Sequence, residues 1–577
     1  MSNFYQDNPD IQFHMERMDF SRIVEMREEE FAEKDLYPEA PVDLADAVDN
    51  YCRVLDIVGD ISGNFVAPRA REVDETGARY RDGEVLYAPG TLEAIDRLKK
   101  AELMGFTLPR RYGGLNLPKT IYSIATELIS RGDASLMNIF GLQEISDTIN
   151  KFATEDQKER YLPRFSSGEV MGSMALTEPD AGSDLQTVML KAEEGEDGNW
   201  RLSGVKRFIT NGCADISLVM ARSEAGTAGG RGISLFIYER DENMRIRRIE
   251  SKLGIHGSPT CELQFDNAEA ELLGKRKMGL IKYTMSLMNG ARLGVAAQAL
   301  GIAEAAYREA ARYAQDRIQF KKPIRNFTAV YEMLTDMRVN IEATRSLLYE
   351  TSRIVDIKEG IDDLIIGHPE RASELKADNK RYNKLAALFT PIVKAFASEM
   401  ANKVCYDAIQ IHGGVGFTCE FDVERFYRDV RITNIYEGTT QLQVVAAIGG
   451  VMGGVAADQL NRYEAEHDLS SHPELFAPAK KVAAHLQTAI EHVREQKDSA
   501  FQEYHAKRLV DMAIDAITCY LVCIDALASE RKRKVARIFT DRATHRVTSA
   551  LNHILSGDRW IIDFNRDVIE GSLDKSI

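Results

Sequence analysis

The stretch Ile411–Gln443 reads IHGGVGFTCEFDVERFYRDVRITNIYEGTTQLQ and joins a glycine turn, a charged helical segment and one isolated carboxylate. Glu437 is the only Asp, Glu, Lys or Arg between Arg431 and Asp458. Its neighbours are Ile, Tyr, Gly and Val, so we expect it to lose water, which raises a carboxyl pKa and suits a general base near neutral pH. Gly438 leaves room for a substrate to approach the backbone. The alternative is a buried, hydrogen-bonded Glu at a helix end. The motifs in the rest of the chain decide between a general base and this structural role.

Composition excludes several classes of protein. The 577 residues are 44% hydrophobic and 28% charged, which suffices for several buried cores. A net charge of -16 argues against nucleic-acid binding, because no basic excess exists to neutralise phosphates. The seven cysteines form no CxxC and fit reduced thiols. No apolar run of about 18 residues and no leader pattern occur, so we expect a cytoplasmic protein without a membrane span; peripheral membrane contact stays open.

The hydrophobic period changes twice along the chain. Apolar spacing is helical from residue 41, becomes alternating near Gly172, and is helical again from Met278. Short β-type runs occupy 200–205, 216–220 and 233–238. The pattern predicts a mainly α protein with a central β domain. The predicted parts are an N-terminal extension at 1–40, a helical domain at 41–170, a β domain at 171–275, a helical bundle at 276–455 with a charged insert near 358–384, and an extra helical domain at 456–577. Residues 1 to about 35 are polar and charged and are expected on the surface.

Two loops of the β domain carry candidate ligand groups. In Met174–Asp184, Pro and Gly force a turn after an apolar strand, and Thr177 and Ser183 add hydroxyls to free N–H groups. Such a loop suits a flavin edge or a phosphate, although an ordinary β-turn looks the same. Phe208 and Thr210 are two residues apart and so share a strand face on which a flat ring could stack. The alternative there is a plain strand that ends in an Asn-Gly turn.

Two arginines stand out in the following helix. Arg292 is the only charge from Tyr283 through Ala303, and a lone charge in such a segment needs a partner or a function. Arg317 closes the helix and suits a bidentate contact with a pyrophosphate. A helix C-terminal charge favoured by the dipole explains Arg317 equally well.

The motifs LTEPDAGSD, RFITNG, GARLGVAAQALGIAEAAYREAARYAQDRIQF, QIHGGVGF and IYEGTTQLQ, in this order, resemble the acyl-CoA dehydrogenase family over residues 40 to 455. The resemblance implies a helical domain, a β-barrel-like domain and a four-helix bundle, with FAD between the last two. It implies Glu437 as the catalytic base and no metal. Substrate contacts would come from Ser183, Arg292 and Gly438. FAD contacts, partly across a dimer interface, would come from Leu176, Thr177, Ser183, Phe208, Thr210, Arg317, Phe320, Gln410, Gly414, Thr439 and Gln441.

Several positions depart from the family pattern. Phe208 stands where many members have Trp, Lys321 where many have Gly, and Thr328 where Gln is common. Some members place the base immediately before the arginine of the long helix, but Ala291 there accepts no proton. Only Glu437 is then available. By a loose correspondence, Leu136 and Phe140 would lie near the floor of the acyl pocket.

The resemblance also implies the chemistry. Glu437 would take the α-proton of an acyl-CoA while the flavin accepts the β-hydride, which yields a trans-2-enoyl-CoA. The Glu437 backbone N–H and a flavin hydroxyl would stabilise the developing enolate. Electrons would pass to an electron-transferring flavoprotein. The alternatives are an acyl-CoA oxidase, which reduces oxygen, and a non-catalytic scaffold on the same fold.

About 120 residues follow the part that ordinary members contain. This arrangement resembles the very-long-chain and methylmercaptopropionyl-CoA dehydrogenase subgroups, in which extra helices cover a tetramer surface. The resemblance implies a homodimer, and an accessory domain of unrelated use is the alternative. Leu509–Val522 is apolar enough for a core helix or, because basic residues follow at 531–534, for an interfacial segment. The core helix is favoured.

Overall fold

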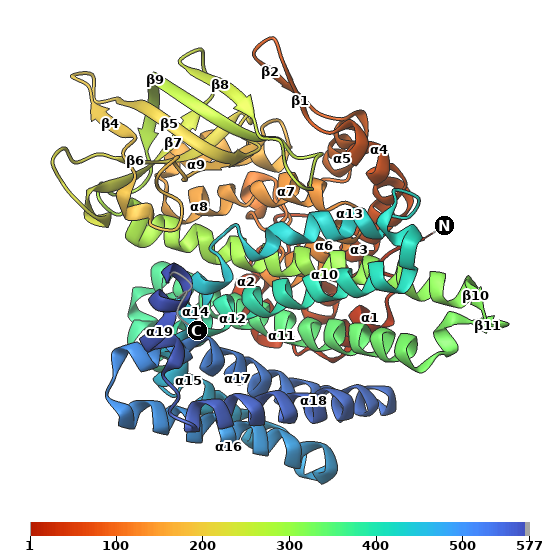
Figure 1. The fold of residues 1–577 in the computed structure, drawn as a ribbon. Helices are drawn as coiled ribbons and strands as arrows, with labels where there is room; N and C mark the ends of the chain where they lie inside the picture. The colour runs from red at the N-terminus through yellow and green to blue at the C-terminus, as the bar shows by residue number, and fades with distance from the viewer. Residues whose placement is uncertain (1, 572–577) are drawn as a thin grey trace.

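The N-terminal part of the computed structural model, which describes residues 2–571, is helical with one small hairpin (Figure 1). Local signals begin its helices: Asp43 accepts a hydrogen bond from the Asp46 N–H, and Thr154 with Gln157 forms a capping box. Its main elements are α3 (Leu44–Asp60), α4 (Ala70–Thr76), β1 (Arg79–Arg81), β2 (Glu84–Leu86), α5 (Pro89–Lys100), α6 (Lys119–Gly132), α7 (Ala134–Leu142), α8 (Ile145–Phe152) and α9 (Glu155–Ser166).

The middle part is one seven-stranded sheet of mostly antiparallel pairs. The strand order is β3-β6-β4-β5-β9-β7, β8 pairs with β9, and β6 also pairs with β7, so the sheet closes on itself. The three predicted β runs all form strands, because their alternating apolar residues fill the inside of this closed sheet. Its strands are β3 (Gly172–Ala175), β4 (Lys191–Glu194), β5 (Trp200–Thr210), β6 (Ile216–Arg222), β7 (Ile233–Glu239), β8 (Met244–Ile249) and β9 (Thr260–Leu272).

A helical bundle lies beneath the sheet. Small residues let its helices approach closely: a Cβ on Gly301 of α10 would lie 2.3 Å from the Glu127 carbonyl oxygen of α6. The charged insert near 358–384 forms the tip of a long helical hairpin in which α11 and α12 meet around Pro369–Arg371. The elements are α10 (Met285–Asp316), β10 (Ile318–Gln319), β11 (Lys322–Pro323), α11 (Thr328–Gly367), α12 (Ala372–His412), α13 (Val423–Val430) and α14 (Thr440–Met452).

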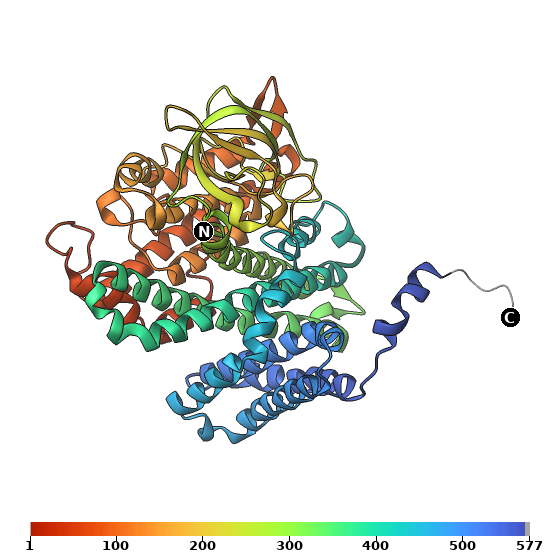
Figure 2. The same cartoon turned by 90° about the vertical axis from the view of Figure 1, so that its left-hand side faces the viewer.

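The C-terminal helices form a further layer below the bundle. Leu509–Val522 lies in α17 and is buried apart from Asp511. This segment is therefore a core helix, as predicted, and not an interfacial segment. It packs against α16, α18 and the bundle helices α11 and α14. The last described helix extends away from the body of the molecule (Figure 2). These helices are α15 (Val455–Glu466), α16 (Pro473–Gln496), α17 (Ser499–Ala526), α18 (Glu530–Leu555) and α19 (Trp560–Glu570).

The expectation that the N-terminal residues lie on the surface is wrong. Helices α1 (Pro9–Arg17) and α2 (Ser21–Arg27) bury Ile11, Met15 and Ile23 in the main core. The polarity of this segment misleads because its acidic groups have buried partners. Asp10 forms ion pairs with Arg345 of α11 and Lys532 of α18.

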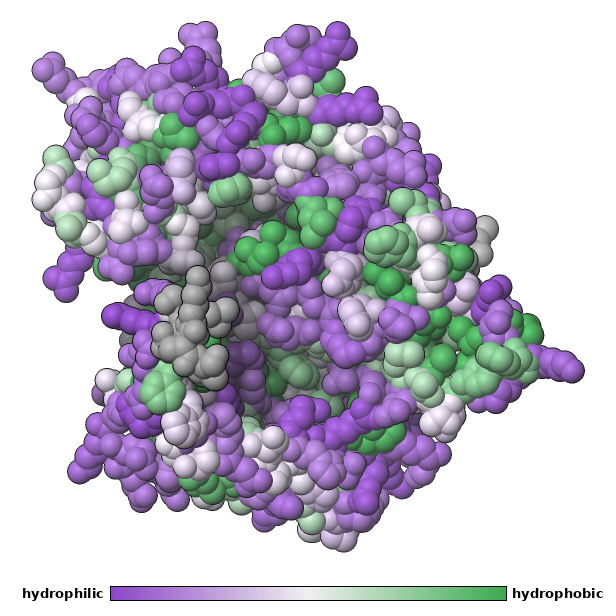
Figure 3. All heavy atoms as spheres, viewed as in Figure 1, coloured by the Kyte–Doolittle hydropathy of each residue, from purple (hydrophilic) through white to green (hydrophobic). Residues whose placement is uncertain are grey.

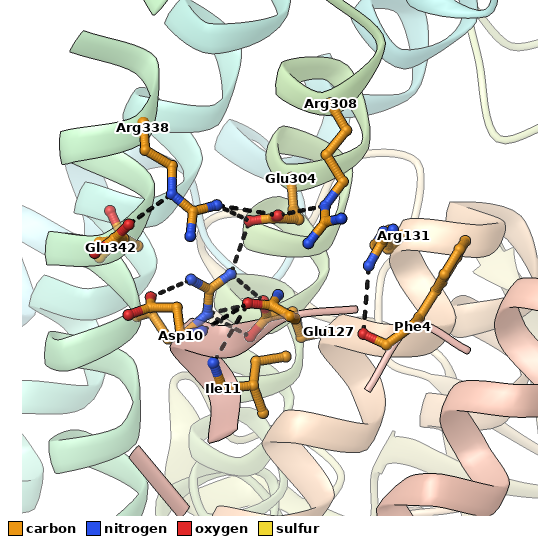
Figure 4. Close-up of polar contacts among 12 residues, drawn as sticks. Phe4, Asp10, Ile11, Glu127, Arg131, Glu304, Arg308, Arg338 and Glu342 are labelled. Atoms are coloured by element: carbon orange, nitrogen blue, oxygen red, sulfur yellow. Dashed lines mark hydrogen bonds and ion pairs between the residues drawn. The ribbon is translucent and has the colours of Figure 1, made fainter. Parts of the chain in front are cut away.

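These ion pairs belong to a buried charge network at the junction of five helices (Figure 4). Arg345 is fully buried and its guanidinium lies 2.6 Å from Glu127 of α6 and 3.0 Å from Glu304 of α10. Burial works to raise the pKa of Asp10, but Lys532 and Arg345 hold it well below its usual range. The network therefore joins the first helix, the bundle and the C-terminal layer through charges that have no access to water.

In residues 2–571, no individual helix combines the length and apolar composition of a membrane crossing. Only α14 and α15 taken together, which bend by 65° at their junction, pass that test.

Candidate active site

One cavity lies where the N-terminal helices, the sheet and the bundle meet. Glu437 and Tyr436 of the segment before α14 line it together with Ala291 of α10 and Thr210 of β5. Figure 3 shows this face of the molecule hollowed between the β domain and the C-terminal helices. Further lining residues include Tyr122, Met137, Asn138, Gly141, Leu142, Met174, Leu287, Gly290 and Gly294.

The backbone at Glu437 is strained. Its φ is 54°, and Gly438 follows at 89°, so two successive residues are left-handed. A non-glycine residue in this region costs on the order of 1–3 kcal/mol and persists only where its surroundings hold it. Gln443 Nε2 donates to the Glu437 carbonyl at 3.1 Å and to the Gly438 carbonyl at 2.9 Å. Lys394 Nζ donates to the same Gly438 carbonyl at 2.7 Å, so these contacts hold the Glu437 side chain at the cavity.

Burial raises the pKa of the Glu437 carboxyl, while the charges of Arg292 and Lys394 work in the opposite direction. Arg292 is buried and donates to Asn289 Oδ1 at 3.0 Å, and its Nε has no partner among the described residues. The lone arginine of α10 therefore has its charge partner in Glu437. Burial lowers the pKa of Lys394 to about 8, against the opposing effect of Glu437. The Glu437 carboxyl thus has a raised affinity for protons because it is buried, and two positive charges nearby partly offset that effect.

Sequence reasoning missed the polar residues around Glu437. Tyr436 Oη donates to Asn138 Oδ1 at 3.2 Å and contacts Gln298. Gln298 Nε2 donates to Asn138 Oδ1 at 2.8 Å, which connects the Glu437 segment to α7 and α10. A signal existed for Lys394, since it is the only charge in the run from Leu388 to Ala397. The argument that singled out Arg292 applies to it unchanged.

The LTEPDAGSD loop is built around a buried ion pair. Lys206 Nζ donates to Glu178 Oε1 at 2.8 Å and to the Leu176 carbonyl at 2.9 Å. Glu178 also accepts hydrogen bonds from the Met189 and Leu190 N–H groups. Leu176 is buried, Thr177 half-buried and Ser183 exposed, so only the outer side of the loop is open to a ligand.

Phe208 and Thr210 follow on β5. A bulge between Lys206 and Ile209, with Phe208 at φ 60°, breaks the regular alternation on which their shared face was argued. Thr210 nevertheless lines the cavity, and the Phe208 side chain is 51% exposed. Gly290, across the cavity, has no atom within 4 Å of an added Cβ. An exposed aromatic ring, a hydroxyl and open space together fit the flat ring system of a flavin.

The residues expected at the ADP half of FAD lie elsewhere. Arg317, Phe320, Gln410 and Gly414 are all exposed, and Phe320 is 88% exposed. At about 1.5 Å per residue, Arg317 at the end of α10 is about 39 Å from Ala291, which is longer than an extended FAD. One chain therefore does not bring the two sets of residues together. The φ of 63° at Lys321 explains why glycine is common at this turn.

The remaining expected residues are simpler to place. Thr439 caps α14 by accepting a hydrogen bond from the Leu442 N–H at 3.4 Å, and Gln441 is exposed on its first turn. Leu136 and Phe140 are not among the residues that line the cavity, and their expected place near its floor stays a prediction. Phe140 stacks on Tyr122 in the core, and the cavity instead meets Met137 and Gly141 of the same helix.

Four family models match consecutive parts of the chain. The acyl-CoA dehydrogenase N-terminal, middle and C-terminal domains match residues 53–169, 173–268 and 281–448, and the acyl-CoA dehydrogenase C terminal model matches 453–557. The 3-methylmercaptopropionyl-CoA dehydrogenase of Ruegeria pomeroyi is 34% identical over 432 residues, which cover 70% of either chain. An acyl-CoA dehydrogenase of Bacillus subtilis is 38% identical over 408 residues, 69% of this chain and 97% of the relative.

Solved structures agree in fold. The butyryl-CoA dehydrogenase of Megasphaera elsdenii has a TM-score of 0.60 at 33% identity and covers 71% of this chain and 99% of its own. An acyl-CoA dehydrogenase of Bacillus anthracis has a TM-score of 0.72 at 24% identity and covers 87% of both chains. The predicted fold class is confirmed. The chain therefore belongs to the acyl-CoA dehydrogenase family and is a FAD-dependent oxidoreductase that acts on CH–CH bonds.

Proposed function

We propose that Glu437 is the catalytic base with which this dehydrogenase desaturates an acyl-CoA to the trans-2-enoyl-CoA. One observation carries the assignment: a carboxyl whose pKa burial raises is held by a strained backbone at the edge of the cavity. Ala291, at the other position that family members use, has no proton acceptor.

The backbone around Glu437 also supports the chemistry. The Glu437 N–H donates no hydrogen bond to a described residue, so it is available to the thioester carbonyl as negative charge develops there. The charges of Arg292 and Lys394 favour the ionised form of Glu437 and so oppose the rise in its pKa that burial causes. FAD, held beside Phe208 and Thr210, would supply the acceptor for the β-hydride. Glu437 would then take the α-proton, in a cavity that Thr210 of the closed sheet lines on one side and α7 on the other.

The electron acceptor separates the proposed dehydrogenase from an oxidase. Adding acyl-CoA without oxygen is expected to bleach the bound flavin. Electron-transferring flavoprotein should then restore its colour much faster than air does, as followed by absorbance. Rapid formation of peroxide on admitting air would assign an oxidase instead, and a flavin that no acyl-CoA bleaches would favour a scaffold.

We also propose that the protein is a homodimer in which each FAD contacts both chains. Phe320 is 88% and Phe417 87% exposed, and Figure 3 shows hydrophobic residues gathered over the β10–β11 end. Exposed aromatic groups of this size indicate a covered surface. Arg317, Gln410 and Gly414 lie near these groups in the sequence, far from the cavity of their own chain. The extra helices pack against α11, α12 and α14, which supports their role in covering a tetramer surface. The seven free cysteines support a cytoplasmic location.

Light scattering of the intact protein is expected to give the mass of two chains. Arg317→Ala should weaken FAD retention at least about tenfold, because it removes a bidentate donor to the pyrophosphate. Arg312→Ala is the matched control, since Arg312 is exposed on the same helix and, within residues 2–571, pairs only with Glu309. A mass of four chains would overturn the covering role of the C-terminal helices. A stable monomer that keeps its flavin would overturn the shared site.

A further inference from the structure

The cavity that holds Glu437 ends in charged and polar groups. Lys119, Glu144, Asp147 and Glu359 line it, as do the hydroxyl-bearing Tyr122 and Thr148. They come from α6, α8 and α11, whereas the cavity near Glu437 is lined largely by apolar or small residues of α7 and α10. An acyl chain that enters beside Glu437 therefore runs toward a polar end.

The charged groups are held in a fixed arrangement. Lys119 Nζ pairs with Glu144 and lies 3.3 Å from Asp147. Lys151, behind the lining, lies 2.8 Å from Asp147 and 2.7 Å from Glu359. Asp356 accepts hydrogen bonds from the first two N–H groups of α6, at 2.6 and 2.8 Å, which fixes the helix end that carries Lys119. Three carboxylates and a single ammonium group thus face the cavity.

Two neutral hydroxyl groups at this end have hydrogen-bonding capacity to spare. Tyr122 is 6% exposed and Thr148 is 3% exposed. The Tyr122 hydroxyl lies beside the hydroxyl of Thr126, and among the described residues the Thr148 hydroxyl has no hydrogen-bond partner. Tyr122 Oη lies 3.8 Å from the position of a Cβ on Gly141, which itself lines the cavity. Burial raises the pKa of Tyr122 well above its usual value, so the phenol stays protonated. Buried hydroxyl groups normally have partners, and the open cavity is where a ligand would supply them.

We propose that this polar end binds the distal end of the acyl group and selects a short acyl chain that ends in a hydrogen-bond donor such as a hydroxyl. The proposal rests on the proposed desaturation at Glu437. A methyl end would cover Tyr122, Thr148 and the carboxylates without replacing the hydrogen bonds that they make with water. A distal carboxylate would face three groups of its own charge. A hydroxyl donates to a carboxylate and accepts from Tyr122 or Lys119.

The test compares acyl-CoAs of matched size on the flavin-loaded enzyme: hexanoyl-CoA, ω-hydroxypentanoyl-CoA and glutaryl-CoA, with dodecanoyl-CoA as a length probe. The hydroxylated substrate is expected to exceed hexanoyl-CoA in kcat/KM by at least about 100-fold, because a site built for a hydrogen bond strongly rejects the analogue that lacks it. Glutaryl-CoA and dodecanoyl-CoA are expected to be poorer still. Equal or better rates with hexanoyl-CoA, glutaryl-CoA or dodecanoyl-CoA would overturn the proposal.

Substitutions at the polar end test whether its hydroxyl groups cause the preference for the hydroxylated substrate. Tyr122→Phe keeps the ring and its stacking on Phe140, and should reduce the preference for the hydroxylated substrate at least about tenfold. Thr148→Val is a second, independent variant with the same expected direction. Tyr51→Phe is the matched control, because Tyr51 of α3 is buried, its hydroxyl has no partner among the described residues, and it does not line the cavity. An unchanged preference in both Tyr122→Phe and Thr148→Val would contradict the proposal.

The outcomes distinguish a failure of desaturation at Glu437 from a failure of selectivity at the polar end. If no acyl-CoA bleaches the flavin, the desaturation at Glu437 fails and the selectivity fails with it. If acyl-CoAs bleach the flavin but rank by hydrocarbon length, the desaturation stands and only the polar end is rejected.

Discussion

Glu437→Gln is expected to lose turnover by about 10²- to 10⁴-fold, the range that a positioned general base contributes, while FAD and acyl-CoA still bind. The amide keeps the shape of the carboxyl and takes no proton. Because burial raises the pKa of Glu437, the wild-type rate should also fall on acidification above the pH at which an ordinary glutamate titrates. Stopped-flow bleaching of the flavin measures the chemical step, and the change in the flavin spectrum on mixing reports substrate binding.

Glu399→Gln is the matched control for this variant. Glu399 is an exposed carboxylate that accepts hydrogen bonds from Asn434 and Thr440, on either side of the Glu437 segment. Its loss should leave most activity intact. If Glu437→Gln kept more than a few per cent of the wild-type rate, the assignment of the base would be wrong.

Arg345→Met is expected to destabilise the protein by about 3–5 kcal/mol, the range for breaking a buried ion pair by removing one partner. The substitution leaves Asp10, Glu127 and Glu304 buried with less compensating charge. Chemical denaturation followed by circular dichroism gives the shift, and limited proteolysis should show earlier cleavage of the N-terminal segment.

Arg53→Met, on α3, is the control. Arg53 and its partner Asp49 are both more than half exposed, so the loss of this ion pair should cost about 1 kcal/mol or less. A similar loss for the two variants would show that the buried network has no special role in stability.

Features that depend on residues close together in the chain could be predicted from the sequence. The strands of the β domain and the isolation of Glu437 depend on neighbours within a few residues, and the structure contains both. Arg292 could be singled out because a lone charge in an apolar helix demands a partner. The same rule applied to Lys394 and was overlooked.

Long-range pairing was the part that could not be predicted. Asp10 looks like a surface residue until Arg345 and Lys532 are beside it. The polar end of the cavity unites α6, α8 and α11, and no spacing along the chain indicates that Lys119 and Glu359 lie together. The bulge at Phe208 likewise depends on the register of β9 rather than on β5 alone.

The buried position of the N-terminal helix has a consequence for synthesis. Asp10 leaves the ribosome long before its partner Lys532 of α18. Until α18 emerges, the carboxylate of Asp10 lacks one of its counter-charges, and α1 has no complete site in which to pack. Contacts of such sequence separation form late and slowly. The catalytic core can therefore collapse around its own helices during translation, while the first helix completes its packing only after α18 has emerged.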